Sequence, residues 1–198
     1  MATDKPGRRA VFLDRDGVIN HKPPDGAYVR SWSEFRFLPG ALTALAELHA
    51  SGATLLLVTN QRGVARGLIR PTDLAKIHAQ LVAELAAVEV QLGGIYVCPH
   101  DAGECDCRKP DVGLFLRAQR EHPWISFPNS DLIGDSLTDL EAGRRLGMRL
   151  WLVGDNEHAA ATERDAQARA YILEGRAPSL LELVRHGGLL YGAEGSGR

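Results

Sequence analysis

The sequence predicts an α/β domain in which a mostly parallel central sheet lies between two layers of helices. Two observations support this fold class: short apolar runs alternate with amphipathic helical patterns, and polar residues with related chemistry follow several of the apolar runs. Strand–helix alternation is typical of parallel sheets that helices cover on both faces. The 198 residues are enough for one domain with a sizeable core, so we expect a single domain over residues 1–198.

The expected strands are short apolar runs bounded by polar or turn-forming residues. A continuous run of this length is consistent with a strand that is buried in the sheet. These runs are Ala10–Leu13, Thr54–Thr59, Gly94–Cys98, Asp131–Gly134 and Arg149–Val153, with a weaker one at Ala170–Leu173.

The expected helices lie between these runs. The first follows Pro39 and Gly40 and runs to about Ala50, and Gly52 is expected to end it. The others are a helix that begins at Pro71 with Leu74, Ile77, Leu81 and Leu85 on one face, a helix after Gly113, a helix from about Thr138 to Leu146, and a short helix over about Ser179–Arg185.

Composition and charge argue against several classes of protein. The formal net charge is -2 at pH 7 with both signs mixed, which does not favour binding to nucleic acid or membrane surfaces through bulk charge. The chain has no apolar stretch long enough to span a bilayer, and residues 1–9 lack the apolar segment of a secretory signal. We therefore expect a cytoplasmic monomer with an ordered core at about 9–187 and flexible tails.

The most informative motif is Asp14-Arg15-Asp16-Gly17, which ends the first apolar run. Two carboxylates at a strand exit contribute little to packing. They suit a divalent cation site and a division of labour between a nucleophile and an acid–base group. An ordinary Asp-Gly turn would explain the motif on its own equally well. The motifs that follow later strands favour the functional interpretation.

Two further motifs supply groups suited to phosphate. Thr59 ends the second apolar run, and its hydroxyl with the backbone amides beyond it could bind phosphate oxygens, although a plain turn is the simpler explanation of this motif alone. Lys109 lies in Arg108-Lys109-Pro110 and would act as an electrophile for a phosphoryl group if it lies near the carboxylates.

A third carboxylate, Asp135, follows the fourth expected strand. Together with Asp14 and Asp16 it would supply oxygen ligands for Mg²⁺. Asp139 comes four residues later, in the first turn of the next helix, where its charge also suits the helix dipole. In parallel sheets, ligands bind beyond the carboxyl ends of the strands, and all of these residues are expected there.

All three cysteines lie close together, and a histidine lies among them: Cys98, His100, Cys105 and Cys107. An odd, clustered set in a chain without a signal peptide argues against a disulfide framework. Three thiolates and one imidazole suit tetrahedral Zn²⁺, and four protein ligands leave no open position, so the expected site is structural. The zinc ion would fix the loop that carries Arg108 and Lys109.

Taken in chain order, these motifs resemble those of the haloacid dehalogenase superfamily of phosphohydrolases, over about residues 9–184. The resemblance implies a Rossmann-like three-layer sandwich. The superfamily often adds a large cap domain, but the short segments between the motifs leave no room for one. The residues that carry the resemblance are Asp14-Arg15-Asp16-Gly17, Thr59, Lys109 and Gly134-Asp135 with Asp139.

The resemblance also implies a role for each motif residue. Asp14 would attack phosphorus and form an aspartyl-phosphate, and Asp16 would protonate the leaving alkoxide and then activate water. Mg²⁺ would be bound by the side chains of Asp14 and Asp135 and by the backbone carbonyl of Asp16. Thr59 and Lys109 would bind the transferring phosphoryl oxygens.

The cysteine loop followed by Arg108-Lys109-Pro110 resembles a subgroup of this superfamily that contains heptose bisphosphate phosphatases and histidinol-phosphate phosphatases. The segments 14–20, 28–29 and 59–67 are more similar to the heptose enzymes, which implies hydrolysis of the C7 phosphate of a heptose 1,7-bisphosphate in nucleotide-activated heptose biosynthesis. Asp139 would orient Lys109 or a metal-bound water. The implied substrate contacts are Asn60, Gln61, Arg62, Arg108, Asp25 and Tyr28, and Arg66 is a further candidate for the second phosphate.

Two alternatives remain open from the sequence. Histidinol phosphate would be hydrolysed by the same chemistry, but it carries only one phosphate, and the three arginines Arg62, Arg66 and Arg108 fit a bisphosphate better. A catalytically inactive zinc-bearing binding module is the alternative of another class. The intact set of carboxylates, threonine and lysine argues against it.

Overall fold

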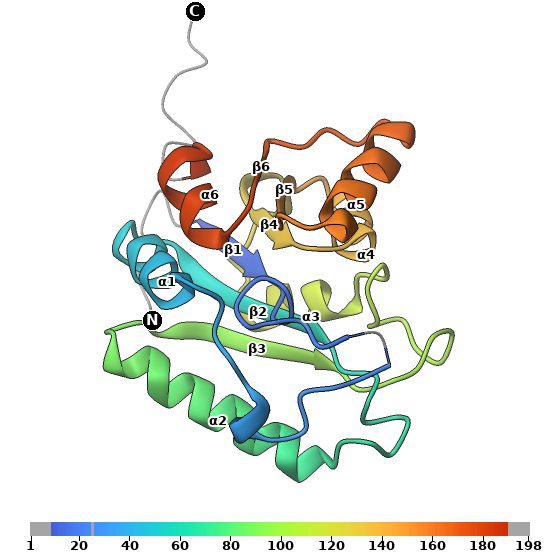
Figure 1. Ribbon diagram of the computed structural model, residues 1–198. Coiled ribbons are helices and arrows are strands. Elements are labelled where there is room, and N and C mark those ends of the chain that lie inside the picture. The colour runs from blue at the N-terminus through green and yellow to red at the C-terminus, as the bar shows by residue number, and fades with distance from the viewer. Residues whose placement is uncertain (1–8, 25, 190–198) are drawn as a thin grey trace, which may run out of the picture.

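The computed structural model describes residues 9–24 and 26–189 and has a six-stranded parallel sheet in the order β3-β2-β1-β4-β5-β6 (Figure 1). This confirms the predicted fold class. Asp25 and the tails expected to be flexible, residues 1–8 and 190–198, lie outside the described residues. The strands are β1 (Ala10–Leu13), β2 (Thr54–Asn60), β3 (Leu92–Cys98), β4 (Asp131–Gly134), β5 (Arg149–Val153) and β6 (Gly175–Ala177).

Helices pack against both faces of the sheet, so the domain has three layers. One face carries α1 (Ala41–Ala50), α2 (Pro71–Ala87) and α6 (Leu180–His186). The other carries α3 (Gly113–Glu121), α4 (Leu137–Arg145) and α5 (Glu157–Ala168). Two short 3-10 turns, η1 (Trp32–Glu34) and η2 (Phe127–Asn129), lie in the connections.

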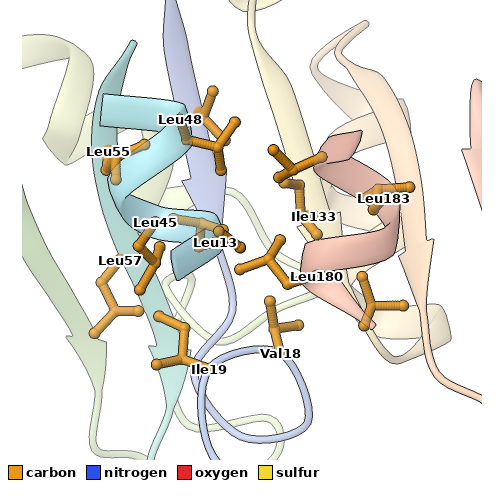
Figure 2. Close-up of a cluster of buried hydrophobic side chains, with 14 of the residues drawn as sticks. Leu13, Val18, Ile19, Leu45, Leu48, Leu55, Leu57, Ile133, Leu180 and Leu183 are labelled. Atoms are coloured by element: carbon orange, nitrogen blue, oxygen red, sulfur yellow. The ribbon is translucent and has the colours of Figure 1, made fainter. Parts of the chain in front are cut away.

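Strand β1 shows how the sheet separates two apolar clusters. Val11 and Leu13 belong to the cluster beneath α1, α2 and α6, whereas Ala10 and Phe12 belong to the cluster beneath α3, α4 and α5. Successive side chains of a strand point to opposite faces, so a strand covered on both sides needs apolar residues at every position. Figure 2 shows Leu13 in the first cluster, among side chains from α1 and α6.

The strand order positions the polar motifs. The chain builds outward from β1 to β2 and β3, then returns to place β4 on the other side of β1. The crevice beyond the carboxyl ends of the strands at such a switch point is the usual ligand site of this architecture. Asp14 follows β1 and donates its backbone N–H to Ile133 O of β4 at 3.0 Å, so Asp14 and Asp135 flank the switch point.

Two details near the carboxyl terminus differ from the sequence prediction. The strand expected at Ala170–Leu173 is wrong, because the sixth strand is Gly175–Ala177 and the segment before it leaves the end of α5. Helix α5 was not predicted. It buries only Ala159, Thr162 and Ala166, so it lacks the stripe of large apolar residues that identifies a helix.

No large cap covers the crevice within residues 9–24 and 26–189. Only a loop, η1 and α1 connect β1 to β2. Among the described helices, none is both long and apolar enough to cross a membrane.

Candidate active site

A polar cavity of about 300 Å³ lies beyond the carboxyl ends of the strands at the switch point. It is lined by most of the residues that the sequence motifs singled out, which come from four separate stretches of chain. Thr59 is buried and does not line the cavity, and Asp25 is outside the described residues. The sequence-predicted residues on the cavity wall are Asp14, Asp16, Tyr28, Asn60, Gln61, Arg62, Arg108, Lys109, Asp135 and Asp139.

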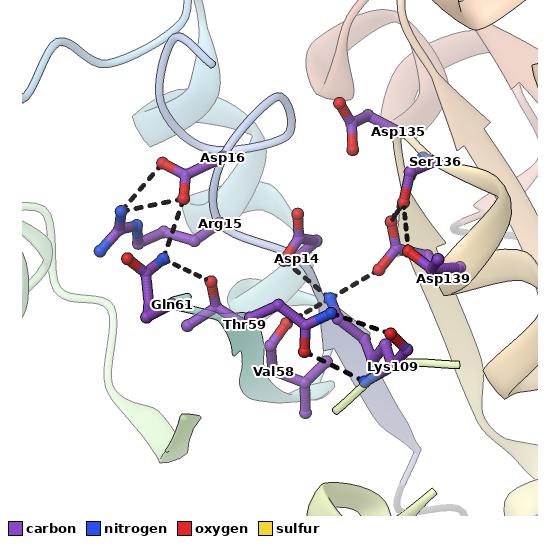
Figure 3. Close-up of polar contacts among 12 residues, drawn as sticks. Asp14, Arg15, Asp16, Val58, Thr59, Gln61, Lys109, Asp135, Ser136 and Asp139 are labelled. Carbon is purple, nitrogen blue, oxygen red and sulfur yellow. Dashed lines mark hydrogen bonds and ion pairs between the residues drawn. The ribbon is translucent and has the colours of Figure 1, made fainter. Parts of the chain in front are cut away.

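Lys109 is the central cation of the site (Figure 3). Its ammonium group donates to Asp14 Oδ1 at 2.8 Å and to Val58 O at 2.8 Å, and it lies 2.5 Å from Asp139 Oδ1. Burial alone would lower the pKa of Lys109, but the charges of Asp139 and Asp14 outweigh it and raise the pKa above its ordinary value. Lys109 therefore stays protonated and compensates two buried carboxylates.

Asp14, the predicted nucleophile, lines the cavity beside a fixed cation. Burial raises the pKa of Asp14 to about 7, and Lys109 opposes this while the nearby carboxylates add to it. A cation bound to Asp14 would favour its ionised form, as the nucleophile requires.

The backbone of Lys109 is fixed as firmly as its side chain. Asn60, the last residue of β2, donates from Nδ2 to Lys109 O at 3.0 Å and accepts from Lys109 N at 3.0 Å through Oδ1. These two hydrogen bonds attach the loop after the cysteines to the end of β2. Asn60 thus has a positioning role in the structure, and its expected substrate contact stays a prediction.

Asp139 also has a structural role at the start of α4. Its Oδ2 accepts from Ser136 Oγ at 2.5 Å and from the backbone N–H of Ser136 at 3.2 Å, and the second of these bonds is one half of a capping box. Capping a helix satisfies amide groups that otherwise lack partners. The other carboxylate oxygen is beside Lys109, so one residue links the helix start to the central cation.

The carboxylate of Asp16 is turned toward a set of donors. It accepts from Arg15 Nη2 at 2.9 Å through both oxygens, from Asn20 Nδ2 at 2.8 Å and from Gln61 Nε2 at 2.9 Å. Burial alone would raise the pKa of Asp16, but Arg15 and these hydrogen bonds outweigh burial and lower it. Gln61 Nε2 also donates to Thr59 Oγ1 at 2.9 Å and so connects two of the expected catalytic residues (Figure 3).

Three carboxylates form a group that could bind a metal ion. Asp14, Asp135 and Asp139 each offer an oxygen within 4.8 Å of the others. Both oxygens of Asp139 are engaged, one by Lys109 and the other by Ser136. Asp14 is paired with Lys109 and Asp135 with Lys22 through one oxygen each, so these two are the better candidates. Gly17 leaves room for Asp135, because a Cβ atom at this position would collide with the Asp135 carboxylate. Its φ of +93° also favours glycine.

Lys22 is a residue of the site that sequence analysis missed. Its ammonium group donates to Asp135 Oδ2 at 2.7 Å, and its side chain lines the cavity. It lies in an irregular loop with no motif around it, so only the folding of that loop over the strand ends reveals it.

The cysteine loop places four candidate zinc ligands together, with one ligand atom from each of Cys98, His100, Cys105 and Cys107 within 4.8 Å of the others. The Sγ atoms of Cys98 and Cys105 are 3.6 Å apart, and Cys107 Sγ is 3.4 Å from His100 Nδ1. A tetrahedron with metal–sulfur bonds of about 2.3 Å has edges of about 3.8 Å, so the cluster matches the size of a zinc site.

The arginines divide into two groups. Arg62 and Arg108 line the cavity, whereas Arg66 does not. Arg62 and Arg66 both pair with Asp101, which attaches the loop after β2 to the cysteine loop. Arg108 Nη1 donates to His100 O at 3.3 Å, so its position depends on the geometry of the same loop.

Comparison with known proteins connects this site to a family. A family model described as Hydrolase_like, HAD-hydrolase-like, matches residues 106–182. A D-glycero-alpha-D-manno-heptose-1,7-bisphosphate 7-phosphatase of Mycobacterium bovis is 45% identical over 143 residues, which are 71% of this chain and 75% of the relative. A D-glycero-beta-D-manno-heptose-1,7-bisphosphate 7-phosphatase of Pseudomonas putida is 37% identical over 177 residues, 89% of this chain and 99% of the relative.

A solved structure agrees with these relatives. The D,D-heptose 1,7-bisphosphate phosphatase of B. bronchiseptica, crystallised with magnesium and phosphate, is 33% identical and superimposes with a TM-score of 0.77, covering 89% of this chain and 96% of that one. Identity above 30% over most of both chains, together with the ordered motifs at the strand ends, shows the relationship. The chain belongs to the haloacid dehalogenase superfamily, in the family of the heptose-1,7-bisphosphate 7-phosphatases.

Proposed function

We propose that this protein hydrolyses the C7 phosphate of D-glycero-D-manno-heptose 1,7-bisphosphate in nucleotide-activated heptose biosynthesis. The observation that carries the proposal is the placement of Asp14, Lys109 and Asp135 around one cavity at the switch point of the sheet. Relatives that are named for this reaction cover most of the chain. They do not favour the alternative of histidinol phosphate, and relatives of either anomeric name match this chain.

The reaction we propose has two steps. Asp14 attacks phosphorus to form an aspartyl-phosphate, and the leaving sugar oxygen takes a proton from Asp16, which has to be in its protonated form for this step. Asp16 then accepts a proton from the water that cleaves the aspartyl-phosphate. Lys109 binds the phosphoryl oxygens, and Asp139 keeps Lys109 in place. The expected phosphate contact of Thr59 stays a prediction, because Thr59 is buried and does not line the cavity.

The site suits Mg²⁺ by its donor set. Asp14 and Asp135 offer carboxylate oxygens, and Asp16 follows closely enough in the chain to add its backbone carbonyl. When bound, the cation offsets negative charge as the carboxylate nucleophile approaches the phosphate. Gly17 keeps a side chain out of the space that Asp135 occupies.

The second phosphate of the substrate requires cations away from the nucleophile. Arg108 and Arg62 line the same cavity as Asp14 and present planar guanidinium groups that match phosphate geometry. Gln61 and Tyr28, two further expected substrate contacts, also line this cavity. A structural Zn²⁺ on the cysteine loop would stabilise the segment that ends in Arg108 and Lys109.

The first experiment is to measure phosphate release by the purified protein with Mg²⁺. The substrates are both anomers of the heptose 1,7-bisphosphate, histidinol phosphate and 4-nitrophenyl phosphate, and Asp14→Asn is the inactive control. We expect selective loss of the 7-phosphate from one anomer. Preference for histidinol phosphate would contradict the proposed substrate, and absence of turnover with every substrate would contradict the enzyme and favour a binding module.

Replacing Gly17 with alanine tests whether this turn makes room for the metal ligand. We expect Gly17→Ala to weaken Mg²⁺ binding and to lower the melting temperature, because the new Cβ would displace Asp135. Gly52→Ala is the matched control, since Gly52 has φ +85° and open space around its Cβ position. In the control, backbone strain should lower the free energy of unfolding by only about 1 to 2 kcal/mol, and the affinity for Mg²⁺ should be unchanged. Equal Mg²⁺ affinity of both variants in calorimetry would contradict the argument.

Two other expectations stay predictions. Nothing in the fold tests whether the protein is a monomer, and sedimentation at several concentrations would decide this. A cytoplasmic location is also still a prediction, which fractionation of cells would check.

A further inference from the structure

A buried polar chain runs from helix α2 to the acid–base carboxylate. His78 of α2 accepts from Arg15 Nη1 at 3.2 Å through Nε2, and Arg15 Nη2 donates to both oxygens of Asp16 at 2.9 Å. We propose that His78, acting through Arg15, is a positioning residue for Asp16 in the reaction. The inference rests on the proposed phosphatase function and adds a residue that contacts neither the substrate nor the metal.

His78 is an unusual residue for its place on α2. Its neighbours on the same buried face are Leu74, Ile77, Leu81 and Leu85, and a further leucine would suit packing there. A buried imidazole costs free energy unless it has a hydrogen-bond partner. The partner here is Arg15, which is 63 residues away in the sequence, so the polar side chain serves a tertiary contact.

The protonation state of His78 agrees with an acceptor role. An arginine can only donate hydrogen bonds, so Nε2 of His78 has to be unprotonated. Burial, assisted by the charge of Arg15, lowers the pKa of His78 to about 4. The neutral imidazole therefore accepts from Arg15 at physiological pH.

Arg15 is a poor choice for stability alone. It is fully buried, and its Nε atom has no hydrogen-bond partner among the described residues. Among the described residues, Arg15 forms its ion pair with Asp16. Buried ion pairs often add no stability over apolar residues of similar volume. Its guanidinium group lies 6.0 Å from the centre of the Phe35 ring, which restricts it further.

The arrangement ties the orientation of Asp16 to a helix outside the cavity. Arg15 Nη2 fixes the plane of the carboxylate, and His78 fixes Arg15 Nη1. Asn20 donates to Oδ1 and Gln61 to Oδ2, so Arg15 is the described residue whose side chain contacts both oxygens of Asp16 at once. Proton transfer requires that the carboxyl group of Asp16 lie within hydrogen-bond reach of the leaving oxygen. Small rotations of this carboxyl group therefore reduce the rate of proton transfer.

The test uses the difference between leaving groups. A sugar alkoxide needs a proton from Asp16, whereas 4-nitrophenolate leaves without one, so a misplaced Asp16 should slow phosphorylation of Asp14 by the sugar substrate more than by the aryl ester. We compare single-turnover phosphorylation by both substrates in the wild type, His78→Leu, His78→Gln and Ile77→Ala. Glutamine keeps an acceptor for Arg15, and Ile77→Ala disturbs packing on the same helix while leaving the Arg15–His78 contact in place.

We expect His78→Leu to lower the rate with the heptose bisphosphate about tenfold, since proton transfer contributes roughly 10²- to 10⁴-fold to such reactions. The rate with 4-nitrophenyl phosphate and the KM for the sugar should stay within about threefold, and His78→Gln should recover most of the loss. Ile77→Ala should lower the melting temperature at least as much and leave both rates unchanged.

Equal losses with both substrates, or the same loss in Ile77→Ala, would overturn the positioning role and leave the phosphatase assignment intact. A wild type that hydrolyses neither ester would instead overturn the proposed function and the inference that rests on it.

Discussion

Lys109→Met is expected to slow hydrolysis severely and to destabilise the fold. Lys109 is buried between Asp14 and Asp139, which are also buried, so its loss leaves two carboxylates without compensation. Removing one partner of a buried ion pair costs about 3 to 5 kcal/mol, and protonation of Asp14 or Asp139 would recover part of this. Loss of a preorganised donor to the transferring phosphoryl group should lower kcat by roughly 10²- to 10³-fold.

Urea denaturation and steady-state kinetics would measure these two effects. Lys76→Met is the matched control, because Lys76 is an exposed residue of α2 whose side chain is 76% accessible. The control should match the wild type in both measurements. A Lys109→Met protein with wild-type stability and activity would show that the central cation is dispensable and would contradict the arrangement of Figure 3 as the catalytic one.

Cys107→Ser is expected to lose Zn²⁺ and most of the activity. The substitution removes one of four ligands from a loop that has little core of its own, and the loop ends in Arg108 and Lys109. Because binding of a structural metal contributes directly to folding, the variant should melt at a lower temperature than the wild type. A loosened loop should misplace the two cations and reduce kcat/KM by at least about tenfold.

Metal analysis, thermal melting and the phosphatase assay would follow the three effects. Asp106→Asn is the control, since Asp106 is exposed in the same loop and is not among the four clustered ligands. It should retain one equivalent of zinc. Wild-type protein that contains no zinc and yet has full activity would contradict the structural site, as would a Cys107→Ser variant that retains zinc.

Much of the site could be predicted because its residues lie at strand ends. The apolar runs 10–13, 54–59 and 131–134 identify strands by local composition, and polar residues directly after them must lie at one edge of a parallel sheet. Asp14 and Asp135 therefore have neighbouring positions as soon as β1 and β4 pair. The four candidate zinc ligands could be predicted equally well, because their ligand chemistry and close spacing are local properties.

The prediction failed or was incomplete where local pattern carries little information. Helix α5 buries small residues and so resembles a polar linker, which led to the wrong strand at 170–173. Lys22 has no sequence context that distinguishes it from a surface lysine, and His78 lies beside the apolar face of an amphipathic helix with no motif around it. Each of these residues acquires its role from a partner far away in the chain.

By itself, the sequence determined the fold class, the family, the carboxylates and lysine of the site and the four clustered candidate zinc ligands. Strand burial and ligand chemistry can be recognised from short segments of sequence. Only the tertiary structure decided which charges compensate one another. It placed Lys109 between Asp14 and Asp139, turned Asp16 toward Arg15, and brought His78 to Arg15 and Lys22 to Asp135. Such pairings depend on distances between segments that the chain brings together only when the sheet and its helices have packed, so no local pattern encodes them.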